Sequence, residues 1–328
     1  MVARMTIKEI ARLSGVGVST VSRVLNKRPD VNEDTRGRGY EPNSNAKHLK
    51  QLSTDCVAVI VRGRNNLFFS GILELLQKRI EAAGLRFLPH YIDENDDEAA
   101  AALRVYAERK VRGIIFMGGC HTDNGAMLSR LPIPCVYSTV NASESYAPNV
   151  SSVSVDDRQG AKKAIDYLFD CGHENMVILS GETQGCNMAH QRYLGVLDSF
   201  KEHGKTLESS RVLVSPFSFS CAYERIKEYT GPDYTAIFAM SDTMAIGAAR
   251  ALMDSGKRVP EDVSVIGYDG IELAQYYHPA LATMRQPQQE LADRSVELLL
   301  ESMDTDCAPK HIQLETELIQ GASVKHIS

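Results

Sequence analysis

Apolar residues follow two patterns along the chain, and the change falls near residue 55. Before that point they recur at helical spacing, in two short groups. These groups are Ile7, Ile10 and Ala11, and then Val21, Val24 and Leu25. After it, short apolar runs alternate with longer segments of helical periodicity. The pattern predicts a small helical head followed by an α/β body.

The head contains two predicted helices joined by a tight turn. Thr6 precedes the first helix and Glu9 follows three residues later, which is the signature of a capping box. Gly15 interrupts the apolar pattern as a helix end does. The second helix has an aliphatic buried face and a polar open face. That open face holds Ser19, Ser22 and Arg23. The spacing favours a helix that enters the DNA major groove and an ordinary helical hairpin equally.

A third helix is predicted to begin and then stop. Asn32 to Arg36 has the composition of an N-cap and a first turn. Gly37 and Gly39 follow at once, where a helix interior avoids glycine. The expected apolar face of this helix is therefore missing.

The body is predicted to form two lobes, each built on a parallel sheet. The first has strands at 56–61, 86–91, 113–117 and 135–138, with helices at 68–83 and 99–108. The pattern restarts after Asp157, with strands at 176–180, 212–214, 236–239 and 263–267 and helices at 160–171, 189–203 and 244–255. Ligands bind such sheets beyond the carboxyl ends of the strands, so the expected site is the cleft between the lobes.

Composition excludes several classes of protein. The chain has 328 residues, of which 43% are hydrophobic and 24% charged, as in globular proteins. No apolar run approaches the roughly 18 residues of a membrane span, and the first residues do not resemble a signal peptide. We therefore expect a cytoplasmic protein without a membrane partner. The seven Cys form no Cys-x-x-Cys pair, which predicts free thiols rather than disulfides or zinc.

Charge is distributed unevenly. Residues 1–52 hold ten Lys and Arg against five Asp and Glu, a balance of +5, so the remaining residues carry −11 of the net −6. A basic head on an acidic body suits a head that meets phosphates, because much of DNA affinity is electrostatic.

Polar residues stand at predicted strand ends in the body. Asp156, Ser241 and Asp269 each follow a strand, and Arg192 lies in the first turns of a helix. Carboxylates and a guanidinium are what the vicinal hydroxyls of a sugar need. Taken singly, each Asp is more often a helix cap. No catalytic motif, metal-ligand spacing or cofactor motif occurs, so we expect neither an enzyme nor a bound cofactor.

The head motifs, with later landmarks, resemble the lactose-repressor (LacI) family of bacterial transcription regulators. The motifs are Thr6–Ala11, Gly15–Val16 and Thr20–Asn26, and the landmarks include 66–69, 155–161, 192–195, 241–247, 259–269 and 283–287. The resemblance implies three parts: a helix-turn-helix headpiece at 1–39, a hinge at 40–52, and a two-lobed, periplasmic-binding-protein-like core at 53–328. The headpiece is shorter than the family pattern by about two helical turns, roughly eight residues.

The resemblance also implies binding residues. For DNA they are Thr6, Val18, Ser19, Ser22, Arg23 and Asn26 in the headpiece and Asn43, Ala46 and Leu49 in the hinge. For the effector they are Phe69, Asp156, Arg192, Phe217, Ser241 and Asp269. Three positions depart from the family: Ser241 replaces an Asn, Gly17 replaces a Ser, and Val18 is unusually apolar.

The expected function is that of a dimeric transcription regulator, most simply a repressor, that binds operator DNA and a small sugar or related metabolite. Two alternatives stay open. A sugar-binding module without DNA function would share the core, and the shortened headpiece favours it. A sugar-converting enzyme would need an acid/base pair near the cleft, which the sequence does not offer.

Overall fold

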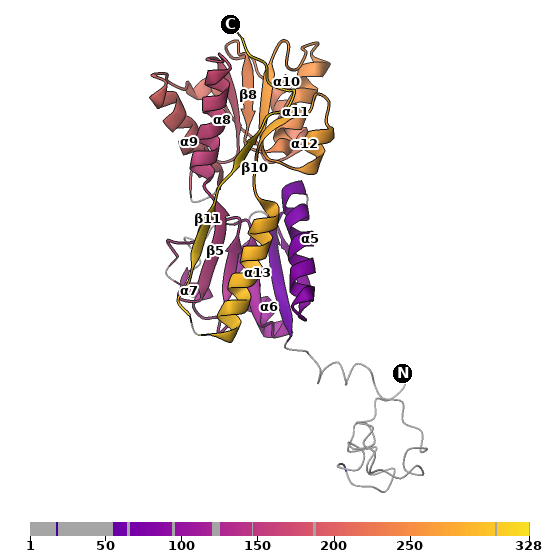
Figure 1. Cartoon of the computed structure of the whole chain (residues 1–328), viewed down its shortest axis with the longest axis vertical. Helices are drawn as coiled ribbons and strands as arrows, with labels where there is room; N and C mark the ends of the chain where they lie inside the picture. The colour runs from indigo at the N-terminus through magenta and orange to yellow at the C-terminus, as the bar shows by residue number, and fades with distance from the viewer. Residues whose placement is uncertain are drawn as a thin grey trace, which may run out of the picture. The chain divides into compact units, whose positions relative to one another are not determined.

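The structure is a computed structural model, which describes Val18 and residues 55–327 except 64–65, 94–95, 120–124, 146, 186–187 and 306. The chain divides into two units, Met1–Ser53 and Thr54–Ser328. The second unit contains two α/β lobes (Figure 1).

Lobe 1 is built on a six-stranded sheet with the order β11-β5-β4-β3-β1-β2. Its strands are β1 (Cys56–Arg62), β2 (Arg86–Ile92), β3 (Gly113–Met117), β4 (Cys135–Ser138), β5 (Val150–Val155) and β11 (His311–Leu314). Its helices are α5 (Leu67–Ala82), α6 (Glu98–Arg109), α7 (Gly125–Leu128) and α13 (Gln288–Asp304). All the strand pairs are parallel.

Lobe 2 repeats the plan with the order β12-β10-β9-β8-β6-β7. Its strands are β6 (Met176–Ser180), β7 (Val212–Val214), β8 (Ala236–Ala239), β9 (Ser264–Asp269), β10 (Ala282–Arg285) and β12 (Glu317–Ile319). Its helices are α8 (Asp157–Asp170), α9 (Met188–Glu202), α10 (Phe219–Lys227), α11 (Asp242–Asp254) and α12 (Glu272–Tyr276), with a 3-10 turn at Ser209–Arg211. Only β12, at the edge, runs antiparallel to its neighbour among the described pairs.

The polypeptide passes between the lobes three times. It leaves lobe 1 between β5 and α8, returns between β10 and α13, and leaves again between β11 and β12. The first and third crossings touch, because the amide of Asp156 donates to the carbonyl of Leu314 at 3.2 Å. The lobes are therefore joined by a narrow group of strands visible at the middle of Figure 1.

Both faces of each sheet are covered, which explains the nearly continuous apolar strands. Along β1, Val57 and Val59 belong to the core under α5 and α13, whereas Ala58 and Ile60 belong to the core under α6 and α7. In lobe 2 the two sides are covered by α10 with α11 and by α8 with α9. The edge strand β2 contains Pro89, which cannot donate a hydrogen bond to a neighbouring strand.

These elements confirm the predicted α/β body, with shifted ends. Helix α8 begins at Asp157 rather than Gly160, and α11 begins at Asp242 rather than Met244. The pattern did not predict α10, α13, β11 or β12, and it treated the lobes as consecutive segments. The structure shows instead that lobe 1 is completed by α13 and β11, after the chain has passed through lobe 2.

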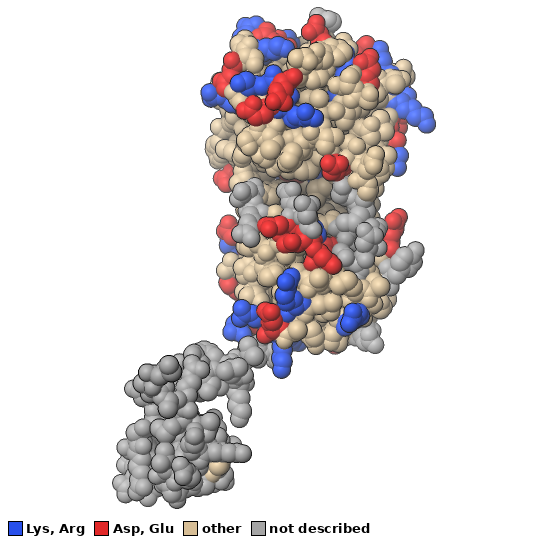
Figure 2. Space-filling model, turned by 180° about the vertical axis from the view of Figure 1, so that it is seen from behind, with Lys and Arg blue, Asp and Glu red and all other residues tan. Residues whose placement is uncertain are grey.

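Among the described residues, no helix is long and apolar enough to cross a bilayer. On the face shown in Figure 2, acidic and basic side chains are interspersed at the outer end of lobe 2, and the part of that lobe nearer lobe 1 is mostly uncharged. The buried cysteines Cys56, Cys135 and Cys171 are free thiols, as the sequence predicts, and burial raises the pKa of Cys135 to about 12.

Candidate functional site

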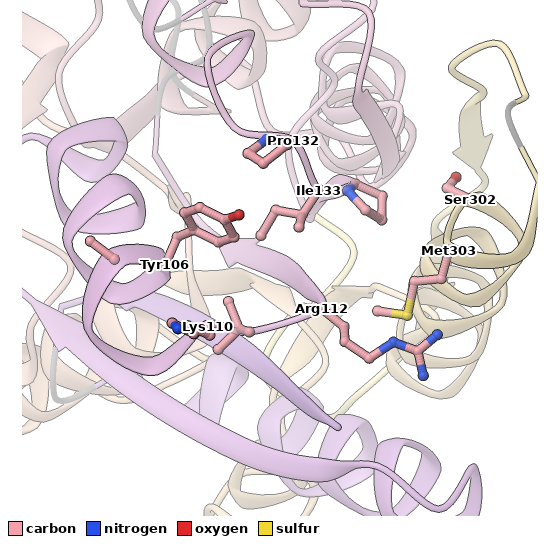
Figure 3. A pocket seen from close by; sticks show the side chains of 10 residues that line it. Tyr106, Lys110, Arg112, Pro132, Ile133, Ser302 and Met303 are labelled. Atoms are coloured by element: carbon pink, nitrogen blue, oxygen red, sulfur yellow. The ribbon is translucent and has the colours of Figure 1, made fainter. Parts of the chain in front are cut away.

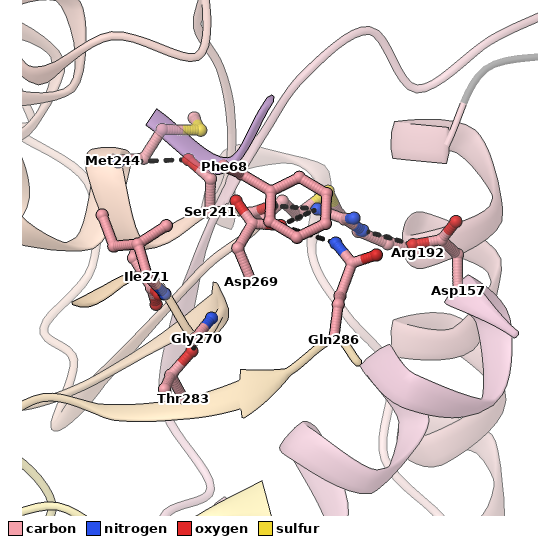
Figure 4. Close-up of polar contacts among 12 residues, drawn as sticks. Phe68, Asp157, Arg192, Ser241, Met244, Asp269, Gly270, Ile271, Thr283 and Gln286 are labelled. Atoms are coloured by element: carbon pink, nitrogen blue, oxygen red, sulfur yellow. Dashed lines mark hydrogen bonds and ion pairs between the residues drawn. The ribbon is translucent and has the colours of Figure 1, made fainter. Parts of the chain in front are cut away.

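A buried arginine organises the carboxyl end of the sheet in lobe 2. Arg192 projects from α9 and is 1% exposed. Its Nε donates to Asp157 Oδ1 at 2.7 Å, and its Nη1 donates to the Met240 carbonyl at 2.5 Å. The guanidinium carbon lies 3.7 Å from the centroid of the Tyr268 ring, which places the cation on the π face (Figure 4). Four elements of lobe 2 therefore meet at one side chain.

Asp269 is the second buried charge of this cluster. Its Oδ1 lies 3.6 Å from Arg192 Nη1 and accepts a hydrogen bond from Gln286 Nε2 at 2.8 Å. Its backbone has a φ of 111°, in the region that residues other than glycine rarely adopt. Such strain is concentrated at functional sites, where the surroundings hold the residue in place. Here the hold includes a second bond, from the Gln286 amide to the Asp269 carbonyl at 3.1 Å.

Burial changes the protonation of these groups. Desolvation raises the pKa of Asp269 to about 7, although the nearby Arg192 pulls it down. Desolvation likewise raises the pKa of Asp157, against the same positive charge. Burial alone would lower the pKa of Arg192, but the two carboxylates outweigh it and the net shift is upward. The arginine is therefore a permanent cation, and the carboxyls depend on it for their charge.

Two of the predicted effector residues are helix caps. Asp156 Oδ1 accepts from the Gln159 amide at 2.9 Å at the start of α8, and Ser241 Oγ accepts from the Met244 amide at 3.2 Å at the start of α11. Both lie at the carboxyl edge of a sheet, as the sequence predicts. Their local role is the cap that the sequence offered as the alternative.

Two predicted aromatic residues lie at the carboxyl edges, one in each lobe. Phe69, in α5, is buried, and its ring approaches the backbone of Gly118 after β3. Phe217 follows β7, and its ring lies against Gly181 after β6. The neighbour of Phe69, Phe68, is drawn across the Arg192 cluster in Figure 4.

Three residues of the cluster were not predicted as site residues: Asp157, Tyr268 and Gln286. Asp157 follows Asp156, and the sequence does not show which of the two acids turns inward. Tyr268 precedes Asp269 and reads as a buried strand residue. Gln286 lies at the second crossing between the lobes, whose existence the sequence pattern does not reveal.

Two surface hollows lie outside this cluster. One, of about 660 Å³, is lined by Tyr106, Lys110, Arg112, Ile133, Met303 and neighbouring residues (Figure 3). It lies at the amino ends of β3 and β4, the opposite edge from the one at which α/β sheets bind ligands. The other, of about 760 Å³, borders Gln286 and carries several carboxylates, including Glu290, Glu315 and Glu317. Within the described part of the chain, no group of His, Cys, Asp and Glu is arranged to hold a metal ion.

Of the nine residues predicted to contact DNA, the structure describes one. Val18 is helical and 44% exposed, which is compatible with a groove-facing position. The other eight lie outside the described residues. They are Thr6, Ser19, Ser22, Arg23, Asn26, Asn43, Ala46 and Leu49.

Comparison with known proteins gives two family matches. Residues 6–38 match the family described as bacterial regulatory proteins, lacI family. Residues 165–324 match the periplasmic binding protein-like domain. The first match covers the predicted helix-turn-helix, and the second covers most of lobe 2 together with the returning segments of lobe 1.

Full-length relatives are similar over nearly the whole chain. The HTH-type transcriptional regulator MalR of Clostridium butyricum is 34% identical, over 98% of this chain and 100% of its own. The HTH-type transcriptional repressor PurR of Vibrio vulnificus is 32% identical, over 98% and 99%. Among solved structures, a complex of the transcriptional regulator CelR with cellobiose aligns with a TM-score of 0.73 and 28% identity, over 98% of this chain and 100% of its own.

Proposed function

The chain belongs to the LacI family of bacterial regulatory proteins and is a DNA-binding regulator of transcription, and from this premise we propose that it is a repressor controlled by a small sugar or related metabolite. The effector binds between the two lobes. The observation that carries the proposal is the buried cluster of Arg192, Asp157 and Asp269 at the carboxyl edge of lobe 2. A guanidinium and carboxylates fixed at that edge offer donors and acceptors to vicinal hydroxyls.

Six residues contact the effector in this proposal. They are Phe69, Asp156, Arg192, Phe217, Ser241 and Asp269. Arg192 donates to ligand hydroxyls, and Asp269 accepts from them. The aromatic rings Phe69 and Phe217 offer apolar faces to the C–H side of a sugar, since the chain contains no Trp. The similarity to a regulator solved with cellobiose supports this class of ligand.

Effector binding reaches the DNA-binding head through the crossings between the lobes. Asp269 is hydrogen-bonded to both the side chain and the backbone of Gln286, at the second crossing. Asp157, the partner of Arg192, is the first residue of α8 after the first crossing. A ligand that pulls on Arg192 and Asp269 therefore changes the relative free energies of open and closed lobes. A ligand with different affinities for the two states shifts their populations.

The DNA-binding part comprises a headpiece at 1–39 and a hinge at 40–52, joined to the core at 53–328. In this proposal the headpiece residues Thr6, Val18, Ser19, Ser22, Arg23 and Asn26 contact the major groove. Asn43, Ala46 and Leu49 of the hinge contact the minor groove, where an apolar side chain can wedge between base steps. Because this function is exerted on chromosomal DNA, the protein works in the cytoplasm and is a regulator rather than an enzyme.

A homodimer is the assembly that binds two operator half-sites, because two-fold protein symmetry matches two-fold DNA symmetry. Lobe 2 carries apolar side chains suited to such a contact. Tyr276 is 77% exposed, and Leu273 and Phe219 are also exposed. They lie on α12 and α10, which neighbour α11 (Figure 1). We place the dimer interface on this group of helices.

Operator titration with and without sugar tests the proposal. The full chain is first used to select duplexes from a random pool, and the selected duplex is then titrated at one fixed salt concentration. We expect tight, sequence-specific binding that changes when one of glucose, maltose, cellobiose or ribose is added. The matched control is Arg192→Lys, which should keep DNA binding but respond to sugar only at higher concentration.

Other outcomes separate the alternatives. Sugar binding by calorimetry without selection of any duplex would identify a sugar-binding module that has lost DNA function. Chemical conversion of the sugar during the titration would identify an enzyme. Specific DNA binding that none of the sugars alters would contradict the sugar effector.

A further inference from the structure

The carboxyl edge of the lobe 1 sheet has a charge pair of its own. Arg62 is the last residue of β1, and Glu98 is the first residue of α6. Arg62 Nη2 donates to Glu98 Oε2 at 3.0 Å. The side chain of Glu98 is 1% exposed, whereas that of Arg62 is 21% exposed. The acid is therefore inside the lobe and the guanidinium is at its surface.

A second contact holds the acid in place. The hydroxyl of Tyr137, in β4, donates to Glu98 Oε1 at 2.6 Å. The Tyr137 ring is itself stacked on Phe116 of β3, with centroids 4.8 Å apart and 21° between the ring planes. Both carboxylate oxygens of Glu98 therefore have partners from different strands. An acid fixed in this way fixes the direction of the arginine that it binds.

The loop after β3 is shaped around the same carboxylate. Gly119 has a φ of +106°, and a Cβ built there would lie 1.9 Å from Glu98 Oε2. No other residue fits this position, both because of the backbone conformation and because the carboxylate occupies the space. The loop, the acid and the arginine thus form one built unit.

This unit borders the proposed effector site. A Cβ at Gly118 would meet the Phe69 ring at 3.0 Å and Arg62 Cβ at 3.6 Å, so Arg62 and Phe69 share a neighbour. Phe69 lies beside Phe68, with ring centroids 6.0 Å apart. Phe68 is drawn across the Arg192 cluster of lobe 2 in Figure 4. The residues from Arg62 to Arg192 therefore follow one wall from lobe 1 to lobe 2.

We propose that Arg62 is a specificity-determining contact that donates to a hydroxyl of an uncharged sugar from the lobe 1 side, and that Glu98 and Tyr137 are positioning residues. The proposal rests on the proposed function. A guanidinium already fixed by a carboxylate loses little rotamer entropy on binding, which favours affinity. Arg62 and Arg192 are each paired with carboxylates, so the two lobes present donors and acceptors together and little net positive charge. That balance suits hydroxyls better than a phosphate.

The test compares the full chain with four variants by calorimetry. The probe is whichever of glucose, maltose, cellobiose and ribose binds the unmodified protein most tightly, together with its monodeoxy analogues. We expect Arg62→Lys to weaken binding of the parent sugar about tenfold or more, because a hydrogen bond to a charged group is lost. The loss should nearly vanish for one monodeoxy analogue, the one that lacks the contacted hydroxyl.

The positioning role has its own readout. Tyr137→Phe removes only the hydroxyl that holds Glu98 and keeps the stacked ring, so it should give a smaller loss with the same analogue pattern. Arg112→Lys is the matched control at the other edge of the same sheet, where Arg112 faces Asp55 at 3.7 Å. It should bind as the unmodified protein does. Thermal unfolding of each variant checks that it is folded.

Several results would overturn the inference. Unchanged affinity in Arg62→Lys, with weakened affinity in Arg192→Lys, would remove Arg62 from the site and leave the proposed function intact. An equal loss for every analogue would show that Arg62 only supports the fold. Tighter binding of glucose 6-phosphate than of glucose would contradict the uncharged class. Failure of all four sugars to bind the unmodified protein would overturn the sugar effector and this inference together.

Discussion

Replacement of Arg192 by Met should destabilise the protein by an amount that depends on pH. The methionine keeps much of the volume but removes the charge, the hydrogen bonds to Asp157 and Met240, and the stacking on Tyr268. Asp157 and Asp269 then remain buried without their cation. Removal of one partner from a buried ion pair costs about 3–5 kcal/mol, and we expect that cost at pH 8.

At pH 5 the cost should be smaller. Burial raises the pKa of Asp269 to about 7, above the ordinary value of 3.8 that applies in the unfolded chain. The native state therefore binds this proton more tightly, and stability falls as pH rises through that window. Arg192 lowers the pKa of both Asp157 and Asp269, so without it both values rise further. At pH 5 both acids can be protonated, and what remains is the lost stacking and hydrogen bonding, about 2 kcal/mol.

Urea unfolding of the full chain at the two pH values measures this difference. Far-UV circular dichroism suits the measurement because the chain has no Trp. Arg258→Met is the control, since Arg258 is an exposed partner of Asp262 and its loss should have no resolvable effect at either pH. An equal penalty for Arg192→Met at pH 5 and pH 8, or a penalty below about 1 kcal/mol at pH 8, would refute the reasoning.

Four further predictions address other parts of the chain. Asn66→Ala should lower the free energy of unfolding by about 1 kcal/mol in urea, because Asn66 Oδ1 accepts from the Phe68 and Phe69 amides at the start of α5; an unchanged midpoint would mean that the cap contributes nothing. Tyr276→Asp should shift sedimentation toward monomer at micromolar concentration while Tyr91→Asp, at a strand edge of lobe 1, should not. Arg23→Ala should cost about 1–3 kcal/mol of operator affinity and relax preference at one base pair per half-site, whereas a uniform loss would indicate a phosphate contact. Insertion of two helical turns between Arg36 and Gly39 should strengthen operator binding and amide protection in the headpiece, and equal affinity would show that the short headpiece suffices.

The α/β body could be predicted because its strands are buried on both sides. A run such as Cys56–Arg62 has one reading, since only a strand covered on both faces is apolar at every position. Asp269 and Arg192 could be proposed because one follows a strand and the other begins a helix near the same edge. The structure brings these two together, with 3.6 Å between their charged atoms.

Other features could not be predicted, for physical reasons. The strand β11 has only four residues and alternates between exposed and half-buried positions, so its pattern resembles that of a loop. The buried face of α13 can be recognised from its periodicity, but periodicity does not identify the sheet on which a helix packs. Asp156 and Asp157 differ by about 100° of helical rotation, which decides that the first is a cap and the second faces Arg192. That choice depends on where α8 begins, within one residue.

The three crossings have a consequence for synthesis of the protein on the ribosome. Lobe 1 appears first, yet its sheet lacks the edge strand β11 until residue 314 has been made, and its core lacks α13 until residue 304. Until then the apolar surface of the sheet that α13 will cover stays exposed, as does the edge that β11 will pair. Nascent domains with uncovered surface and open strand edges are prone to aggregation. The last segments of the chain thus close both lobes at nearly the same moment, and the nascent chain depends on protection until it is almost complete.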